Sequence, residues 1–200
     1  MNGAAMGAAR SRRVVLALGS NLGDRLANLQ AAVDMLAASP ALDNLVVSPV
    51  YETVPVVGPD GPSQPDYLNA ILIADTSLPA DAILELARAA EAARHRVRVQ
   101  RWGPRTLDVD VIVVGDEITE EPELTLPHPW AHERAFVLVP WHDVDPDAEI
   151  PGRGKVANLV ATVDTTGVRL LPVVGLQLPD EQMTPGLAHD RDSASDSRSA

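Results

Sequence analysis

The order of the apolar segments between residues 14 and 114 is the feature that most limits the fold of this chain. Segments rich in apolar, β-branched or aromatic residues, which predict strands, are 14–18, 46–51, 67–74 and 107–114. Segments with apolar residues at helical spacing are 24–39 and 79–94. The order strand, helix, strand, strand, helix, strand predicts an α+β fold. It is that of a ferredoxin-like sandwich, an antiparallel sheet with both helices packed on one face.

Local signals mark where the helices begin and where the chain turns. Asp24 is a plausible N-cap, and Pro79 stands where the first residue of a helix favours proline. Between the second and third strands, residues 53–65 contain four prolines and two glycines. This composition excludes regular structure and predicts a mobile loop beside a site.

The length and composition predict one folded domain with polar ends. A chain of 200 residues with 46% hydrophobic content can bury a core of its own. We expect a flexible tail over residues 1–12, the domain over 13–178 and a disordered tail over 179–200, where apolar periodicity is lost. Within the domain, 158–163 and 168–174 could add a short helix and a strand.

The charge balance limits the partners of this protein. With 16 basic and 28 acidic residues the net charge is -12, which argues against general binding to nucleic acid or anionic lipid. No segment approaches the roughly 20 apolar residues that span a bilayer, and the chain has no cysteine for disulfides or thiol chemistry. We expect a cytoplasmic monomer without membrane or nucleic-acid partners, in which any anion site is local.

Two carboxylates lie two residues apart in the last predicted strand. Strand periodicity puts Asp108 and Asp110 on one face and Leu107, Val109 and Val111 on the other. Their mutual repulsion is relieved if Mg²⁺ lies between them and a polyphosphate supplies further oxygen ligands. The pattern alone also fits two acids on a solvent-exposed strand face. The neighbouring residues have to distinguish a metal site from such a face.

The segment before this strand concentrates positive charge in an acidic chain. Arginines without an intervening acid occupy positions 94, 96, 98, 101 and 105. Guanidinium groups form forked hydrogen bonds with phosphate oxygens, although such a cluster can also be a solvated face that pairs with acids. An acid pair beside an arginine cluster indicates phosphoryl chemistry, because positioning and charge neutralisation supply most of that catalysis. Neither G-x-x-x-x-G-K-[ST] nor G-x-G-x-x-G occurs in the sequence.

Three further positions have side chains that suit a small heterocyclic substrate or a phosphate. Tyr67 and Asn69 share a strand face and offer an aromatic plane and an amide, although ordinary packing explains an aromatic residue equally well. His128 lies between two prolines, in either a rigid turn or a positioned phosphate contact. The turn Gly19-Ser20-Asn21-Leu22-Gly23 could cradle an anion or could simply join a strand to a helix.

Several of these motifs together resemble the 6-hydroxymethyl-7,8-dihydropterin pyrophosphokinase family of folate biosynthesis, over about residues 14–150. The most specific block is Arg-Trp-Gly-Pro-Arg-Thr-Leu-Asp-Val-Asp at 101–110. Leu-Gly-Ser-Asn-Leu-Gly-Asp at 18–24, Pro-Asp-Tyr-Leu-Asn-Ala at 65–70 and Leu-Pro-His-Pro at 126–129 support it. The resemblance implies a ferredoxin-like enzyme in which ATP, the cosubstrate, and a pterin alcohol occupy adjoining pockets bridged by two Mg²⁺ ions.

The resemblance also implies a role for each matching residue. Asp108 and Asp110 look like the metal ligands and, with Arg96 and Arg105, the catalytic set. The residues that would bind ATP are Glu91, Arg96, Arg98, Trp102, Arg105, His128 and Arg134. The residues that would bind the pterin are Thr53, Pro55, Tyr67, Asn69 and Phe136. The implied reaction is attack of the hydroxymethyl oxygen on the β-phosphorus of ATP with release of AMP.

Two other classes of protein remain as alternatives. A nucleic-acid-binding ferredoxin-like module would need stacking aromatics and a basic surface, whereas aromatic residues make up 3% of this acidic chain. A nucleotidyltransferase can use the same pair of carboxylates. The Tyr67 and Asn69 pair and the block at 101–110 favour the pterin enzyme over both.

Overall fold

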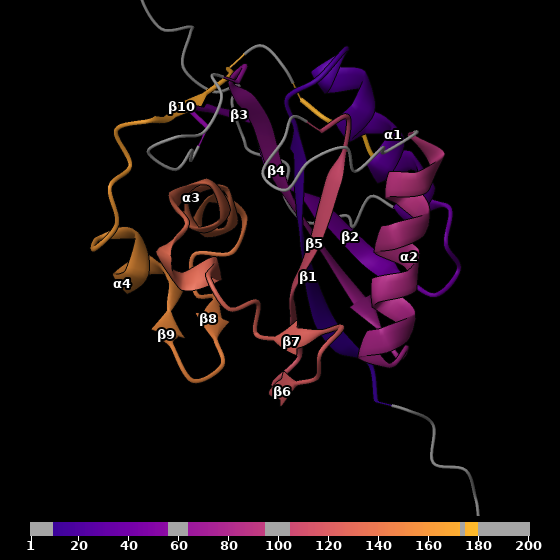
Figure 1. Cartoon of the computed structure of the whole chain (residues 1–200). Helices are drawn as coiled ribbons and strands as arrows, with labels where there is room; N and C mark the ends of the chain where they lie inside the picture. The colour runs from indigo at the N-terminus through magenta and orange to yellow at the C-terminus, as the bar shows by residue number, and fades with distance from the viewer. Residues whose placement is uncertain (1–9, 56–63, 95–104, 173–174, 180–200) are drawn as a thin grey trace, which may run out of the picture.

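The computed structural model describes residues 10–55, 64–94, 105–172 and 175–179, and the elements below belong to these ranges. Its centre is a six-stranded antiparallel sheet, in which β2 pairs with β4 beside the path β10-β3-β4-β1-β5 (Figure 1). The strands are β1 Arg12–Ser20, β2 Asp43–Val47, β3 Tyr51–Thr53, β4 Tyr67–Thr76, β5 Asp108–Val114 and β10 Val168–Leu170. The hairpins β6–β7 (Thr119–Glu120, Thr125–Leu126) and β8–β9 (Glu149–Ile150, Gly154–Lys155) form separate small sheets.

Two helices cover one face of the sheet, as predicted. They are α1 Arg25–Ala37 and α2 Ala80–Ala93, which lie side by side in Figure 1. The Asp24 carboxylate accepts a hydrogen bond of 3.0 Å from the Ala27 N–H, which confirms the predicted cap. Pro79 is the N-cap of α2 rather than its first helical residue, one position earlier in the helix than predicted. The α+β ferredoxin-like fold class is confirmed.

A third layer covers the opposite face. The helices α3 Ala135–Val144 and α4 Val156–Val160 and the 3-10 turn η1 Ala131–Glu133 lie there (Figure 1). Since alternate residues of a strand face opposite sides, the sheet contributes to two cores. Val14, Leu16 and Leu18 of β1 pack toward α1 and α2, whereas Val15 packs with Leu138 and Trp141 of α3. The sheet is therefore the middle layer of three.

The predicted strand 46–51 was wrong as a single element. The chain forms β2 up to Val47 and β3 from Tyr51, with Ser48, Pro49 and Val50 between them. Proline has no N–H for a strand ladder, and Ser48 instead exchanges hydrogen bonds with the Ile71 backbone at 2.8 and 2.9 Å. The expected helix at 158–163 begins earlier, as α4, and the expected strand at 168–174 is the shorter β10.

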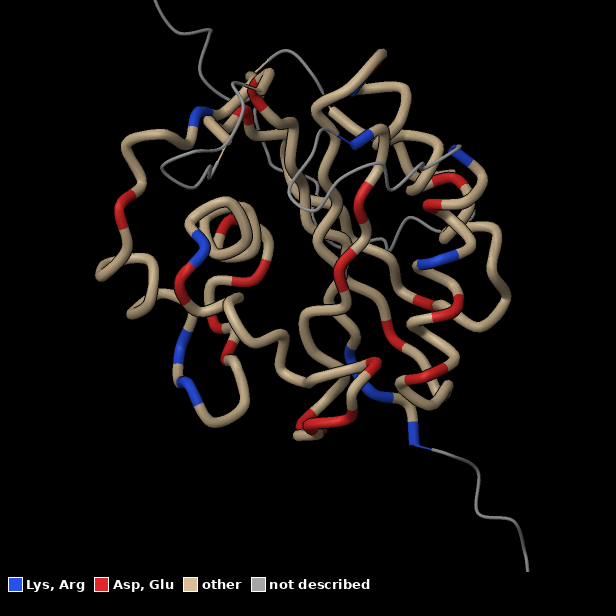
Figure 2. Tube along the Cα trace, in the orientation of Figure 1, with Lys and Arg blue, Asp and Glu red and all other residues tan. Residues whose placement is uncertain are grey.

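The predicted ends of the domain stay predictions. β1 begins at Arg12, inside the expected tail 1–12, and residues 1–9 and 180–200 lie outside the described part of the chain. None of the helices among the described residues is long and apolar enough to cross a membrane. Asp and Glu positions are spread over the whole trace in Figure 2 rather than gathered at one place.

Candidate active site

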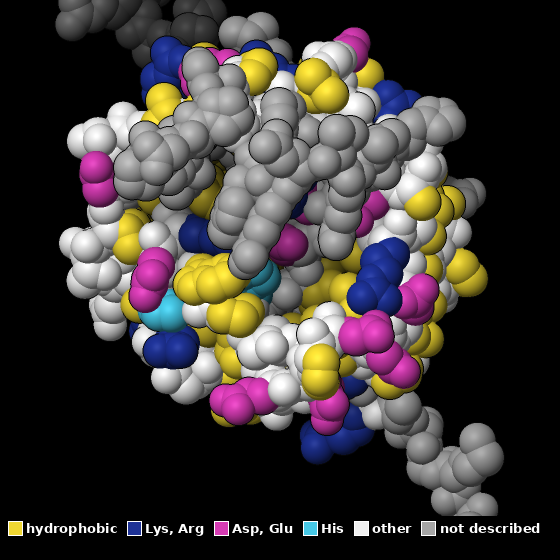
Figure 3. All heavy atoms as spheres, viewed as in Figure 1, with side chains coloured by type: hydrophobic (Ala, Val, Ile, Leu, Met, Phe, Trp, Pro, Cys, Tyr) yellow, Lys and Arg dark blue, Asp and Glu magenta, His cyan; other side chains and the backbone are white. Residues whose placement is uncertain are grey.

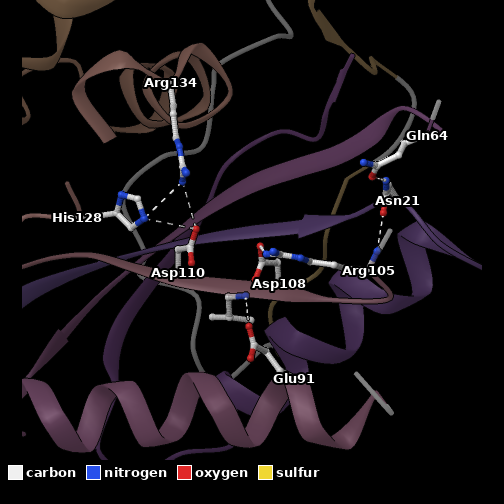
Figure 4. A network of polar contacts seen from close by, with 9 residues as sticks. Asn21, Gln64, Glu91, Arg105, Asp108, Asp110, His128 and Arg134 are labelled. Carbon is white, nitrogen blue, oxygen red and sulfur yellow. Dashed lines mark hydrogen bonds and ion pairs between the residues drawn. The ribbon is translucent and has the colours of Figure 1, made fainter. Parts of the chain in front are cut away.

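The two aspartates of β5 lie on the face of the sheet that α3 covers. β5 is an edge strand of the sheet and pairs with β1, so that Asp108 is opposite Gly19 and Asp110 is opposite Ala17. The carboxylates point the same way in Figure 4, as strand periodicity predicted. Their side chains are 19% and 37% exposed, so both remain open to a ligand.

Arginines from two other segments neutralise this pair. The Arg105 guanidinium donates to Asp108 in a close ion pair, and Arg134 Nη1 lies 3.4 Å from Asp110 Oδ2 (Figure 4). The donor set fits Mg²⁺, because two hard oxygen ligands share one face. The two arginines neutralise these carboxylates in the metal-free protein and would give way to the ion. Within the described residues no group of three or more His, Asp and Glu side chains could hold a metal ion, so a metal here would need ligands from its substrates.

His128 lies next to Asp110 and has a defined protonation. The Trp130 N–H donates to Nδ1 at 3.2 Å, while Nε2 lies 3.4 Å from Arg134 Nη1 and 3.8 Å from Asp110 Oδ2. The role of Nε2 as donor or acceptor depends on the tautomer of the ring. Burial, and then the charge of Arg134, lowers the pKa of His128 from 6.5 to about 4. At neutral pH the side chain is therefore an uncharged ring whose Nε2 faces the carboxylate and the arginine.

An NMR titration of the ligand-free protein tests this protonation state. We expect the ring resonances of His128 to move with a midpoint near pH 4. Below about pH 6.5 the unfolded chain binds a proton that the folded chain binds only near pH 4, so the folded state loses stability as the pH falls through that interval. A midpoint near 6.5 would contradict the buried, neutral ring, and His128→Gln assigns the resonance.

Asn69, which we expect to read the acceptor, lies two strands away from the aspartates on the same face of the sheet. Asn69 pairs with Gly19, so Asn69, Gly19 and Asp108 form one row across β4, β1 and β5. Neighbouring strands are about 4.8 Å apart, which separates Asn69 from Asp108 by roughly 10 Å along the row. The Asn69 amide donates to Thr53 Oγ1 at 2.7 Å, and both side chains are buried. A small flat molecule above Gly19 would touch both ends of the row.

Of the other residues named from the sequence, two lie near this site. A Cβ at Gly19 would lie 3.8 Å from Tyr67 Cδ1, and the Phe136 ring centroid lies 5.5 Å from Arg134 Cζ. Tyr67 starts β4, Phe136 is in the first turn of α3, and Pro55 follows β3. Glu91 approaches β5 from α2, the side opposite the two carboxylates in Figure 4, and its Oε1 accepts a 3.0 Å hydrogen bond from the Val109 N–H. Arg96, Arg98 and Trp102 lie outside the described residues.

The contact of Glu91 leads to a stability prediction. Glu91 is 8% exposed, and a leucine in its place would leave the buried Val109 N–H without its acceptor. We expect Glu91→Leu to lower the free energy of unfolding by about 1–3 kcal/mol, as measured by urea denaturation. Glu91→Gln keeps an acceptor oxygen and should lose less. Equal losses in both variants would show that the carboxylate charge, rather than this hydrogen bond, is what stabilises the fold.

Sequence reasoning missed the structural role of Asn21. This residue is 1% exposed, its Oδ1 accepts from the Arg105 N–H at 2.7 Å, and its Nδ2 donates to the Pro65 carbonyl at 3.3 Å. It also contacts Gln64 at 3.2 Å (Figure 4), so one side chain joins the ends of two segments that carry candidate site residues. The available signal in the sequence was an Asn directly after the apolar strand segment.

The middle of the face in Figure 3 gathers these chemical types. Cationic, acidic and histidine side chains lie there beside exposed hydrophobic ones. The site thus combines paired carboxylates, arginines and a neutral histidine at the edge strand β5 of an antiparallel sheet. This combination defines a class of protein, the α+β enzymes that act on anionic, phosphate-bearing substrates.

Comparison with known proteins identifies the family within this class. Residues 15–146 match the family model for 7,8-dihydro-6-hydroxymethylpterin-pyrophosphokinase. A 2-amino-4-hydroxy-6-hydroxymethyldihydropteridine pyrophosphokinase of Mycobacterium leprae is 51% identical over 176 residues, covering 79% of this chain and 88% of the relative. The enzyme of that name from Pseudomonas aeruginosa is 38% identical over 162 residues, covering 80% and 98%. The chain belongs to the 7,8-dihydro-6-hydroxymethylpterin-pyrophosphokinase family.

Solved structures agree on the fold. The crystal structure of wild-type Plasmodium falciparum HPPK-DHPS with pteroate has a TM-score of 0.57 at 13% identity and covers 76% of this chain. This chain spans 42% of that longer protein. At this identity the likeness concerns the fold alone.

Proposed function

We propose that this protein transfers the pyrophosphoryl group of ATP to the hydroxymethyl group of 6-hydroxymethyl-7,8-dihydropterin, forming the pterin diphosphate and AMP in folate biosynthesis. The row formed by Asn69, Gly19 and Asp108 carries the proposal. It places an amide that can read a heterocycle about two strand spacings, roughly 10 Å, from the carboxylates. Membership of the family supports the same reaction.

On the nucleotide side, Asp108 and Asp110 would hold two Mg²⁺ ions, which supply positive charge to the transferred phosphates. Arg105 and Arg134 already contact these carboxylates. With metal ions bound there, both guanidinium groups would be free to form forked hydrogen bonds with phosphate oxygens. His128 Nε2–H would donate to the triphosphate. We extend the ATP site to Glu91, Arg96, Arg98 and Trp102 on the resemblance of the sequence.

On the acceptor side, Asn69 and Thr53 would bind the edge of the pterin and Tyr67 and Phe136 its faces. The Thr53 hydroxyl accepts the Asn69 amide, which fixes the orientation of that amide before a substrate arrives. Pro55 lies two residues after the end of β3 and would border the ring. Orientation of this kind lowers the barrier, because the hydroxymethyl oxygen must approach the β-phosphorus in line with the departing AMP.

Incubating the protein with ATP, Mg²⁺ and the pterin alcohol tests the proposal. We expect stoichiometric AMP and pterin diphosphate, resolved by chromatography, and none of either when EDTA is present. Release of ADP would indicate a simple kinase, and release of free pyrophosphate would indicate a nucleotidyltransferase. Either result would overturn the proposed reaction.

We infer further that the protein acts as a cytoplasmic monomer on small molecules. The reaction as proposed needs only residues of one chain, since both ends of the row come from one sheet. Sedimentation at assay concentration tests this state, and a dimer as the active species would contradict it.

A further inference from the structure

Two aromatic rings flank the guanidinium of Arg134. Its Cζ atom lies 5.5 Å from the centroid of the Trp130 ring and 5.5 Å from that of the Phe136 ring. Both distances fall within the range of cation–π attraction. Arg134 lies between η1 and α3 and is the N-cap of α3, so the rings come from the two sides of one bend in the chain.

The two rings restrict a side chain that would otherwise be mobile. Fixing an arginine side chain costs up to about 2 kcal/mol of rotamer entropy. Because the two rings already restrict Arg134 in the free protein, less of this entropy is left to lose when a ligand binds. In the bracketed position Arg134 Nη1 faces Asp110 Oδ2 at 3.4 Å, and its side chain is 19% exposed. The cation is therefore held beside Asp110, next to the place where we put the metal-bound polyphosphate.

Trp130 restricts Arg134 from the surface of the protein. The residue is 51% exposed and belongs to neither hydrophobic core, whereas Trp141 is buried in the core beneath α3. The Trp130 ring is edge-on to the His128 ring, with centroids 6.0 Å apart. Hydrophobic side chains are exposed beside histidine side chains on the face in Figure 3. Removing an exposed ring costs little core packing, so its effect on the site can be separated from folding.

We propose that Trp130 is a positioning residue for the nucleotide: together with Phe136 it brackets Arg134 and holds the guanidinium ready for the phosphates of ATP. This inference rests on the proposed function insofar as ATP is the ligand. It assigns to Trp130 an action through Arg134 rather than a contact with the substrate.

Titration calorimetry of four proteins with ATP and Mg²⁺ tests the proposal. The proteins are the parent, Trp130→Ala, Arg134→Ala and the double variant. We expect Trp130→Ala to weaken ATP binding by about fivefold and to raise the KM for ATP more than it lowers kcat. We expect the double variant to bind no more weakly than Arg134→Ala, because Trp130 has nothing to position once the guanidinium is gone.

Further variants and outcomes complete the test. Trp130→Phe keeps a ring and should recover most of the affinity, and Ile118→Ala removes another exposed apolar side chain, 67% exposed, without an effect. Unchanged ATP binding in Trp130→Ala would overturn the proposal, as would additive losses in the double variant. Thermal unfolding of each variant excludes a folding defect. Binding is measured without the pterin, so a parent protein that binds ATP with this coupling but releases no AMP would contradict only the proposed function.

Discussion

Replacing Asp110 by alanine should lower kcat by about 10³-fold, the scale of removing a charge-stabilising group from a transition state. Asp110 is one of two carboxylates on the site face of β5 and the one that Arg134 and His128 approach. Without it a divalent cation would keep one protein ligand, and Arg134 would lose its anionic partner. The Mg²⁺ concentration for half-maximal activity should therefore rise as kcat falls.

The fold should survive this change, since the Asp110 side chain is 37% exposed and packs in neither core. Circular dichroism and thermal unfolding check this point. Asp116→Ala is the matched control, because Asp116 is an exposed acid in the turn just after the same strand. A rate for Asp110→Ala within about tenfold of the parent, with the same Mg²⁺ dependence, would remove the proposed metal role.

Most of the fold could be predicted because its signals are local. Each signal lies within one short segment of the chain: the apolar spacing and the N-cap of α1, and the β-branched residues of β1. The helix α3 was missed for a physical reason. Its sequence, AFVLVPWHDV, is apolar around most of the helix and contains Pro140, so neither helical periodicity nor a clean start marks it. Packing against the sheet, rather than local preference, makes this segment helical.

The site was predictable to the extent that its residues share one strand. Asp108 and Asp110 follow from a two-residue period, and so does the shared face of Tyr67 and Asn69. The row that joins Asn69 to Asp108 depends on which strand lies between them and in which register, and pairing between distant segments leaves no local mark. The same holds for the ring of Trp130 beside Arg134.

That row makes Gly19 the residue whose replacement should separate activity from stability most clearly. A Cβ at this position would lie 3.3 Å from Asn69 Oδ1, 3.8 Å from Tyr67 Cδ1 and 3.9 Å from Asp108 Cβ. The new methyl group would lie between Asn69, where we put the pterin, and Asp108, where we put the metal. We expect Gly19→Ala to lower kcat/KM for the pterin by about 10²-fold, since misplacing reactants by about 1 Å costs that much.

The stability of Gly19→Ala should differ little from that of the parent. Gly19 lies inside β1 and its backbone is not in the left-handed region, so alanine can adopt the same conformation and reduces the entropy of the unfolded chain. The 3.3 Å contact with Asn69 Oδ1 offsets this gain, because that side chain must shift by a few tenths of an ångström. The free energy of unfolding should therefore stay within about 1 kcal/mol of the parent. Gly175→Ala is the control: its new methyl group would meet only Gln177, at 3.9 Å, outside the site. If Gly19→Ala keeps full activity, the acceptor does not lie over this row. If it unfolds the protein, the space above Gly19 belongs to the core and not to a substrate.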